Sequence, residues 1–512
     1  MHSTTPRTES GTESALAGAA ASALGAPSLG ARFSHQDICQ ALGVSPQNAS
    51  PQNEATDFPA PARLCTDSRD LRAGDVFLAI VGANYDGHSF VRQAYQQGAV
   101  GVIVSNPHSV PENATNAWCV EETTVAFLKL ARHHRLRCNA KVIALTGSSG
   151  KTTVKELLTA ALSPLAKTQC SAKNHNNEIG VAQTLLSLEA DTAFLVVEMG
   201  MRGPDQIALL ARHAVPDIGL VINVGPAHIE FLGSLEAIAK AKCELLEHLL
   251  PERQAVGIVN GDDMQLMARA EVVCRQKALP LKTFRLQHAT AITPSETGTV
   301  FTYQGQPIRL ALAGTHQISN ALAVLAVGDA LGYSAEQLAP GLETLTPPEG
   351  RGNRVRLAGW NNAWLLNDAY NANPASVQAS LDAFIGRPKQ AERWVLVMGG
   401  MKELGSHSKD YHLSLGASLA KMPLLDALIA VGEEAPWLLE GFEQTRRTLT
   451  PDVPHPIATQ AATATEVPDQ LRTLGFKTLE ETEILLKGSR TNQLEQLIEL
   501  LTKERFLNGG NG

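Results

Sequence analysis

The sequence contains Lys141-Val-Ile-Ala-Leu-Thr-Gly-Ser-Ser-Gly-Lys-Thr-Thr153, and this stretch predicts the fold of the middle of the chain. The apolar residues 142–145 predict a buried strand. A turn with two glycines follows, and Lys151 begins a predicted helix. A strand, a glycine turn and a helix opened by lysine and hydroxyl residues is the arrangement that cradles the phosphates of a nucleotide.

Each part of this stretch has a chemical use. The turn N–H groups and the helix dipole face an anion, the lysine reaches the outer phosphates, and the Thr152 hydroxyl can bind Mg²⁺. The pattern is shorter than G-x-x-x-x-G-K-[ST], because Leu145 stands at the first glycine position. A plain glycine turn is the alternative. The predicted phosphate-binding residues are Gly147, Ser148, Ser149, Gly150, Lys151, Thr152 and Thr153.

Composition restricts the class of protein. With 512 residues the chain is expected to form about three domains, at ~150 residues each. A hydrophobic content of 44%, a charged content of 18% and a net charge of −8 are typical of a globular protein without a nucleic-acid partner. No apolar run approaches the ~20 residues of a membrane span. The seven dispersed cysteines include no C-x-x-C pair and favour a reducing, cytoplasmic location.

The order of the predicted elements divides the chain. Short strands and helices alternate from residue 34 onward, which predicts largely parallel sheets covered by helices. The Pro/Asn-rich stretch 45–61 reads as a loop. A transit peptide is the alternative for the first residues, although such peptides avoid acids. The predicted segments are a disordered tail at 1–33 and α/β units at 34–138, 139–347 and 348–512.

Two polar side chains follow apolar strands in the middle unit. Glu198 ends the strand predicted at 193–197, and His228 comes after the strand predicted at 218–224. Ligands bind at the carboxyl ends of strands in open parallel sheets, so both residues are candidate Mg²⁺ ligands beside the phosphate loop. A helix cap, a salt bridge or a structural histidine are the alternatives. Lys240 and Lys242 follow on a predicted helix, and spacing alone singles out neither.

Three further polar segments are candidate binding loops. Asn174-His-Asn-Asn-Glu-Ile-Gly180 either binds substrate or simply turns. Asn367-Asp-Ala-Tyr-Asn-Ala-Asn-Pro374 again follows a strand, where an aspartate suits a ribose hydroxyl or an amine. Lys487-Gly-Ser-Arg490 suits a carboxylate or phosphate. Ordinary loop chemistry explains the last two equally well.

Taken in order, these segments resemble the Mur ligase family from about residue 34 to 503. Tyr-Asn-Ala-Asn-Pro is the most specific, because it is typical of the member that adds a dipeptide. The resemblance rests on the segments already quoted and on Thr66-Asp-Ser-Arg69, Gly74-Asp75, Asp86-Gly-His88, Glu198-Met-Gly200, Ala227-His228, Ala241-Lys242, Asn320-Ala-Leu-Ala323 and Met401-x-Glu-Leu-Gly405.

The resemblance implies an α/β protein of three domains: a UDP-sugar-binding domain, a central P-loop domain with a parallel sheet that binds ATP, and a Rossmann-like C-terminal domain. It implies an ATP-dependent, ADP-forming ligase that joins D-alanyl-D-alanine to UDP-N-acetylmuramoyl-tripeptide through an acyl phosphate. Such an enzyme makes a peptidoglycan precursor in the cytoplasm. We expect a monomer that uses ATP and two Mg²⁺ ions.

The resemblance also implies residue roles. Lys151, Lys242 and His228 are the expected catalytic residues, and Lys242 resembles an N-carboxylated lysine. The expected metal ligands are Thr152, Glu198, His228 and Lys242. ATP would also contact Asn320, Asp368 and Arg351, with Arg354 as the alternative arginine. The expected contacts of the UDP substrate are Ser68, Arg69, Asn176 and Asn177. Those of the dipeptide are Tyr370, Asn371, Lys487, Ser489 and Arg490.

Some residues depart from the family pattern. Gly400 stands where an aspartate is usual, Gln317 replaces a common asparagine, and His175 replaces an apolar or aromatic residue. Two related alternatives are the ligase that adds the third residue, whose Asp-Asn-Pro-Arg is absent here, and folylpolyglutamate synthase. A third is a P-loop NTPase that makes no peptide bond. The guanine signature Asn-Lys-x-Asp is absent, which disfavours a GTPase.

Overall fold

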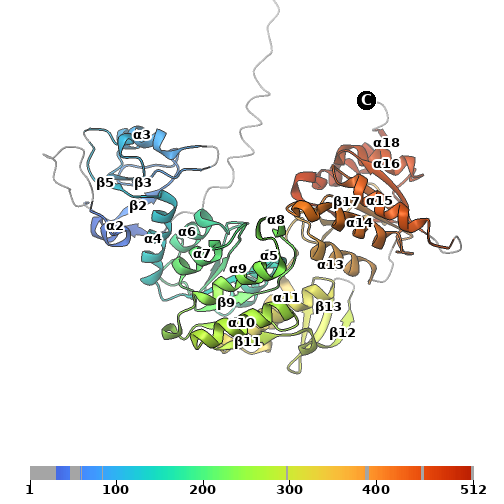
Figure 1. The fold of residues 1–512 in the computed structure, drawn as a ribbon, viewed down its shortest axis with the longest axis horizontal. Helices are drawn as coiled ribbons and strands as arrows, with labels where there is room; N and C mark the ends of the chain where they lie inside the picture. The colour runs from blue at the N-terminus through green and yellow to red at the C-terminus, as the bar shows by residue number, and fades with distance from the viewer. Residues whose placement is uncertain are drawn as a thin grey trace, which may run out of the picture. The chain divides into compact units, whose positions relative to one another are not determined.

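The computed structural model describes residues 30–45, 58, 60–82, 85–112, 114–295, 298–386, 391–450 and 455–508. The chain forms two compact units, shown in Figure 1. The first comprises Met1–Cys138 with Ala182–Glu189, and the second comprises Asn139–Val181 with Ala190–Gly512. Most of the predicted tail and of the loop at 45–61 lies outside the described residues.

The first unit contains a five-stranded sheet in the order β1-β2-β3-β4-β5. Only β1 runs antiparallel to its neighbour. Phe33 in β1 is buried, so Arg32 and Phe33 belong to this sheet, although the predicted tail included them. The elements are β1 (Arg32–Phe33), α2 (His35–Leu42), β2 (Ala62–Cys65), β3 (Val76–Leu78), η1 (Gly87–Phe90), α3 (Val91–Gln96), β4 (Gly101–Val104), η2 (Pro107–Ser109), β5 (Ala117–Cys119) and α4 (Thr123–Leu136).

A six-stranded parallel sheet, ordered β11-β10-β9-β6-β8-β7, forms the middle of the second unit. Its inner strands are continuous apolar runs because helices cover both faces. This confirms the parallel sheet predicted around the phosphate loop. The strands are β6 (Lys141–Thr146), β7 (Thr168–Cys170), β8 (Phe194–Glu198), β9 (Ile218–Val221), β10 (Val256–Asn260) and β11 (Leu281–Phe284).

Helices and a small antiparallel sheet accompany this parallel sheet. The helices are α5 (Lys151–Leu162), α6 (Glu178–Leu186), α7 (Gln206–Ala214), α8 (Ile229–Leu232), α9 (Leu235–Glu247), α10 (Met264–Lys277), α11 (Thr315–Leu331) and α12 (Ala335–Thr344). The small sheet comprises β12 (Thr290–Pro294), β13 (Thr299–Tyr303) and β14 (Gln306–Leu310). Phe301 and Ile308 of the small sheet join the apolar core of α5, α11 and α12.

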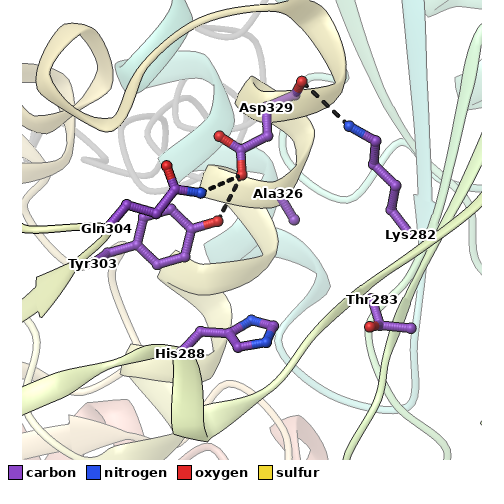
Figure 2. Close-up of a pocket in the computed structure, with 7 residues that line it drawn as sticks. All are labelled: Lys282, Thr283, His288, Tyr303, Gln304, Ala326 and Asp329. Carbon is purple, nitrogen blue, oxygen red and sulfur yellow. Dashed lines mark hydrogen bonds between the residues drawn. The ribbon is translucent and has the colours of Figure 1, made fainter.

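A cavity of about 480 Å³ lies between β11, η4 (Leu286–His288), β13 and the end of α11 (Figure 2). Asp329 on α11 accepts hydrogen bonds from Tyr303 Oη at 2.6 Å and from Gln304 Nε2 at 3.1 Å. From the opposite wall, Nζ of Lys282 donates a hydrogen bond to the backbone carbonyl of Asp329 at 3.4 Å. None of the residues predicted to bind a ligand lines this cavity.

The second sheet of this unit has the order β15-β16-β20-β17-β18-β19, and only β15 is antiparallel. The parallel strands place the ends of β16, β20, β17 and β18 at one edge, as the Rossmann-like prediction requires. The elements are β15 (Asn353–Arg356), β16 (Trp364–Asp368), α13 (Pro374–Ile385), β17 (Arg393–Gly399), α14 (Ser408–Leu419), β18 (Ala427–Val431), α15 (Ala435–Arg446), β19 (Ile457–Ala461), α16 (Val467–Thr473), β20 (Thr482–Lys487), α17 (Leu497–Leu500) and α18 (Lys503–Asn508).

One strand prediction was wrong at its end. The β9 strand ends at Val221, and His228 is the N-cap of α8, because the turn with Gly225 and Pro226 ends the strand pairing. Lys242 lies inside α9, on the predicted helix. The polar segment 174–180 follows β7, and its last residues, Glu178–Gly180, are the start of α6. In the described part of the chain, no helix is long and apolar enough to cross a membrane.

Candidate active site

The phosphate loop has a defined shape in the second unit. Gly150 adopts φ +78°, a left-handed conformation that favours glycine, and caps the start of α5. A Cβ atom at this position would lie 2.7 Å from Oδ1 of Asn320 on α11. Nζ of Lys151 donates to the Gly147 carbonyl oxygen at 2.9 Å. The structure therefore brings the predicted nucleotide residue Asn320 against the loop that holds Lys151.

Asn223 holds this loop from the neighbouring strand end, and the sequence analysis did not select it. Its Oδ1 accepts hydrogen bonds from the N–H groups of Ser148 and Ser149, both at 3.0 Å. Its Nδ2 donates to the Ser149 carbonyl at 3.2 Å. The Ser148 hydroxyl donates to the Gly225 carbonyl at 3.0 Å. The only sequence signal was an amide within two residues of the end of an apolar strand.

Glu198 is placed at the end of β8 as predicted, and only 2% of the residue is exposed. Its Oε2 accepts a hydrogen bond from Oγ1 of Thr152 at 3.1 Å, and its Oε1 accepts one from Nδ2 of Asn176 at 2.9 Å. These three predicted residues therefore form one cluster. A buried carboxylate beside a hydroxyl group offers the hard oxygen donors that Mg²⁺ prefers.

Lys155 is a second residue that the sequence analysis missed. It is fully buried on α5, and its Nζ donates to the carbonyl oxygens of Ser171 at 2.8 Å and Lys173 at 2.7 Å. The Ser171 hydroxyl in turn accepts the backbone N–H of Glu198 at 3.1 Å. Lys155 therefore ties the loop before Asn176 to the phosphate-loop helix.

The electrostatics of the site are governed by two buried lysines. Burial lowers the pKa of Lys151. The negative charges of Glu198 and Glu403 oppose this shift, and the positive charge of Arg351 adds to it. Lys242 is only 1% exposed, and burial followed by the charge of Lys151 holds its pKa well below the usual range. The charged forms of both lysines thus lack sufficient compensating negative charge, which an anionic ligand would supply.

His228 contacts the loop that follows β17. Its Nδ1 lies 2.6 Å from Oε2 of Glu403, and this contact is the main cause of a lowered pKa of Glu403. Among the described residues, no three His, Cys, Asp or Glu side chains converge on one point. The metal roles expected for His228 and Lys242 therefore stay predictions.

The end of β16 forms the other predicted nucleotide region. Oδ2 of Asp368 pairs with Nζ of Lys487 at 2.8 Å and also accepts the Ser380 hydroxyl. Nζ of Lys487 donates to the Asn371 carbonyl at 3.0 Å. The predicted residues Asp368, Asn371 and Lys487 thus lie together, with Asp368 already bound to Lys487.

The two candidate arginines, Arg351 and Arg354, have different neighbours. The Arg351 guanidinium lies 4.2 Å from the centre of the Tyr370 ring, and Arg490 lies 5.7 Å from it. Arg354 instead pairs with Glu483 at 3.2 Å and stacks on Trp364. The charge of Arg351 also helps to lower the pKa of Lys151. The choice between Arg351 and Arg354 as the phosphate-binding arginine stays a prediction.

Two of the residues that depart from the family pattern, Gly400 and Gln317, are explained by their neighbours. A Cβ at Gly400 would collide with the Glu434 carboxylate, so glycine leaves room for a buried acid from the next strand end. Oε1 of Glu434 pairs with Lys402 at 2.5 Å. Gln317 accepts a hydrogen bond from the Asn320 amide at 3.0 Å. Nothing in the structure explains His175.

Other predicted contacts are dispersed. Ser489 accepts a hydrogen bond from the Lys402 N–H at 3.1 Å. Asn177 accepts the N–H of Gly180 at 3.0 Å and so shapes its own loop. In the first unit Ser68 is buried, whereas the Arg69 side chain is 88% exposed and pairs with Asp67 at 2.6 Å.

A phosphate loop beside a strand-end carboxylate and buried lysines is typical of enzymes that use nucleoside triphosphates. The Mur ligase middle domain matches residues 145–328 of the chain. The Mur ligase glutamate ligase domain matches residues 350–490, and the Mur ligase family catalytic domain matches residues 62–141. The chain therefore belongs to the Mur ligase family, which makes it an ATP-dependent, ADP-forming ligase.

Individual relatives agree with this assignment. A UDP-N-acetylmuramoyl-tripeptide--D-alanyl-D-alanine ligase of Synechocystis is 42% identical over 70% of this chain and 77% of its own length. MurF from Acinetobacter baumannii superposes with a TM-score of 0.79 at 32% identity, covering 92% of this chain and 99% of that structure. The structure of MurF ligase from Thermotoga maritima in complex with ADP superposes with a TM-score of 0.74 at 27% identity. The superposition covers 87% of this chain and 98% of that structure.

Proposed function

We propose that this chain joins D-alanyl-D-alanine to UDP-N-acetylmuramoyl-tripeptide at the expense of ATP, and that it works in the cytoplasm as a monomer. The observation that carries this proposal is the cluster of Lys151, Thr152, Glu198 and Asn176 at one sheet edge. The relatives named above are ligases of this kind.

The reaction needs an activated acyl group, because a carboxylate is a poor acyl donor. The γ-phosphoryl group of ATP passes to the terminal carboxylate of the UDP-linked tripeptide and gives an acyl phosphate and ADP. Lys151 neutralises charge that develops on the transferring group, and the loop N–H groups orient it. The dipeptide amine then attacks the acyl carbon, phosphate leaves, and the amine loses a proton.

Mg²⁺ would supply further charge neutralisation on the phosphates, and the buried Glu198–Thr152 pair fits such a cation. We assign two ions to Thr152, Glu198, His228 and an N-carboxylated Lys242. Carbamate formation requires a neutral amine, which burial favours by holding the pKa of Lys242 well below its usual range. The carbamate would then supply anionic oxygen to the metal. In the described part of the chain, the Lys242 amino group has no hydrogen-bond or ion-pair partner to oppose this modification.

The remaining substrates are assigned by domain. We propose that the unit at 34–138 holds the UDP group through Ser68 and Arg69, and that Asn176 and Asn177 also bind the UDP substrate. The domain at 139–347 binds ATP with its phosphate loop and Asn320, and Arg351 and Asp368 complete that site. The domain at 348–512 receives the dipeptide through Tyr370, Asn371, Lys487, Ser489 and Arg490.

A coupled phosphate-release assay tests the activity. Phosphate should appear stoichiometrically only when ATP, the UDP-tripeptide and D-alanyl-D-alanine are all present. Release without the dipeptide would indicate an NTPase that makes no peptide bond. Turnover with a UDP-dipeptide and a single amino acid, or with a folate substrate, would indicate one of the related ligases. Lys151→Ala should abolish product formation while the fold is retained.

Lys242 has a matched control on its own helix. Lys242→Ala should lose most activity, and formate or acetate should restore part of it by replacing the carbamate oxygens. Lys240→Ala, at an exposed position of α9, should keep wild-type activity. Full activity of Lys242→Ala in bicarbonate-free buffer would contradict the carbamate.

A further inference from the structure

Glu403 makes a contact that neither the motifs nor the proposed roles account for. It lies in the loop after β17, and its Oε2 is 2.6 Å from Nδ1 of His228, the N-cap of α8. Sequence analysis treated Glu403 only as part of a family segment. The contact joins the dipeptide domain to a residue proposed to bind metal.

The backbone on both sides is shaped for this contact. His228 has φ +64° and Glu403 has φ +63°, values that residues other than glycine adopt at an energetic cost. Gly405 has φ +53°, and a Cβ there would lie 3.0 Å from Cγ of Glu230 on α8. The loop therefore approaches α8 closely at two points. Strained residues that face one another across a site are more typical of function than of packing alone.

We propose that Glu403 is a positioning residue for His228. Its carboxylate lies 2.6 Å from Nδ1 as an ion-pair contact, which favours a proton on Nδ1 and leaves Nε2 as the nitrogen to bind Mg²⁺. Carboxylates commonly hold the far nitrogen of a metal-binding histidine in this way and fix its tautomer. The same contact couples the loop after β17 to the phosphate site, where Glu403 also acts on Lys151. This inference rests on the proposed metal role of His228.

Two measurements on the full chain test this role without relying on turnover. Nitrogen NMR of ¹⁵N-histidine-labelled protein reports the tautomer of His228, whose signals are identified by their loss in His228→Gln. Titration with Mn²⁺ in the presence of a non-hydrolysable ATP analogue, followed by electron paramagnetic resonance, reports metal affinity. Glu403→Ala should shift His228 toward the Nε2–H tautomer and weaken Mn²⁺ binding about tenfold.

The matched variants separate positioning from general damage. Glu403→Gln keeps an oxygen that accepts from Nδ1–H, so it should retain the wild-type tautomer and most of the Mn²⁺ affinity. Glu433→Ala removes an acid whose side chain is 90% exposed and should change neither measurement. Glu403→Met replaces Glu403→Ala should the alanine variant not fold.

An unchanged tautomer together with unchanged Mn²⁺ affinity in Glu403→Ala would overturn the inference. So would a loss of both in Glu433→Ala, because the effect would then not be specific to Glu403. A wild-type chain that releases no phosphate with the dipeptide would instead refute the proposed reaction. The tautomer and Mn²⁺ measurements remain interpretable in that case, so the two failures are distinguishable.

Discussion

Replacing Asn223 by alanine should loosen the phosphate loop while Lys151 and the proposed metal ligands stay in place. Asn223 makes three hydrogen bonds to the loop, two accepted from the N–H groups of Ser148 and Ser149 and one donated to the Ser149 carbonyl. All three span at least 74 positions of the sequence, and of the two N–H groups only that of Ser148 keeps a further bond, a longer one of 3.2 Å to the Asn223 carbonyl.

The size of the effect follows from these bonds. Each contributes about 1 kcal/mol net, so three order the loop by about 3 kcal/mol. A factor of ten in an equilibrium constant corresponds to about 1.4 kcal/mol. Nucleotide binding to the variant must supply this ordering, and the KM for ATP should therefore rise about 100-fold. The KM for the UDP-tripeptide should change little, because no UDP-substrate residue contacts Asn223.

Steady-state phosphate release with each substrate varied in turn gives both KM values. Asn106→Ala is the control, because Asn106 also accepts a backbone N–H, that of His108, but does so in the first unit. Thermal unfolding of all three proteins checks that they are folded. A folded Asn223→Ala whose KM for ATP stays within threefold of wild type would refute the reasoning. Equal rises in both KM values would indicate general damage instead.

Three further predictions address other parts of the second unit. Lys155→Met removes two charge-assisted hydrogen bonds of a buried lysine, so the free energy of unfolding, measured in urea, should fall by about 3 kcal/mol. A change too small to resolve would contradict this prediction. Gly150→Ala should weaken ADP binding, measured by calorimetry, because the added Cβ crowds Asn320. The control is Gly43→Ala, which has a similar φ of +73° but open space around its Cβ, and it should bind ADP as the wild type does. Equal ADP binding by wild type and Gly150→Ala would count against the contact. Burial lowers the pKa of His316 to about 4, below its unfolded value of ~6.5. The unfolded state therefore binds the proton more readily, and stability should be lost as the pH falls from ~6.5 to about 4. The variant His316→Leu should show a flatter dependence of Tm on pH.

The strands of the parallel sheets were predictable because burial on both faces leaves a simple pattern. β18 is a continuous apolar run, β8 is apolar up to its last residue, Glu198, and both strands are buried throughout. β7 was not predicted, because this edge strand of Thr168–Cys170 is short and only partly buried. β12 was missed for a related reason, since all five of its residues are exposed and carry no apolar alternation.

The candidate site was predictable where its chemistry is local. The phosphate loop and the strand-end acid Glu198 are visible because neighbouring residues create their environment. Asn223, Lys155 and Glu403 were missed because their partners come from other parts of the chain. An asparagine or a buried lysine has no distinguishing sequence context until the fold brings a loop against it.

The charges of the site connect the nucleotide with the state of Lys242. Lys151 and Lys242 are buried near one another, and the positive charge of Lys151 contributes to the lowered pKa of Lys242. Two buried like charges destabilise one another unless negative charge enters the site. Nucleotide phosphates provide that charge for Lys151, and carboxylation would convert Lys242 from a repelling cation into an anion. Both changes bring negative charge to the same lysines, so the carbamate and the phosphates would repel one another unless a cation lies between them. Carboxylation of Lys242 should therefore strengthen nucleotide binding only when Mg²⁺ is present to link the carbamate to the phosphates.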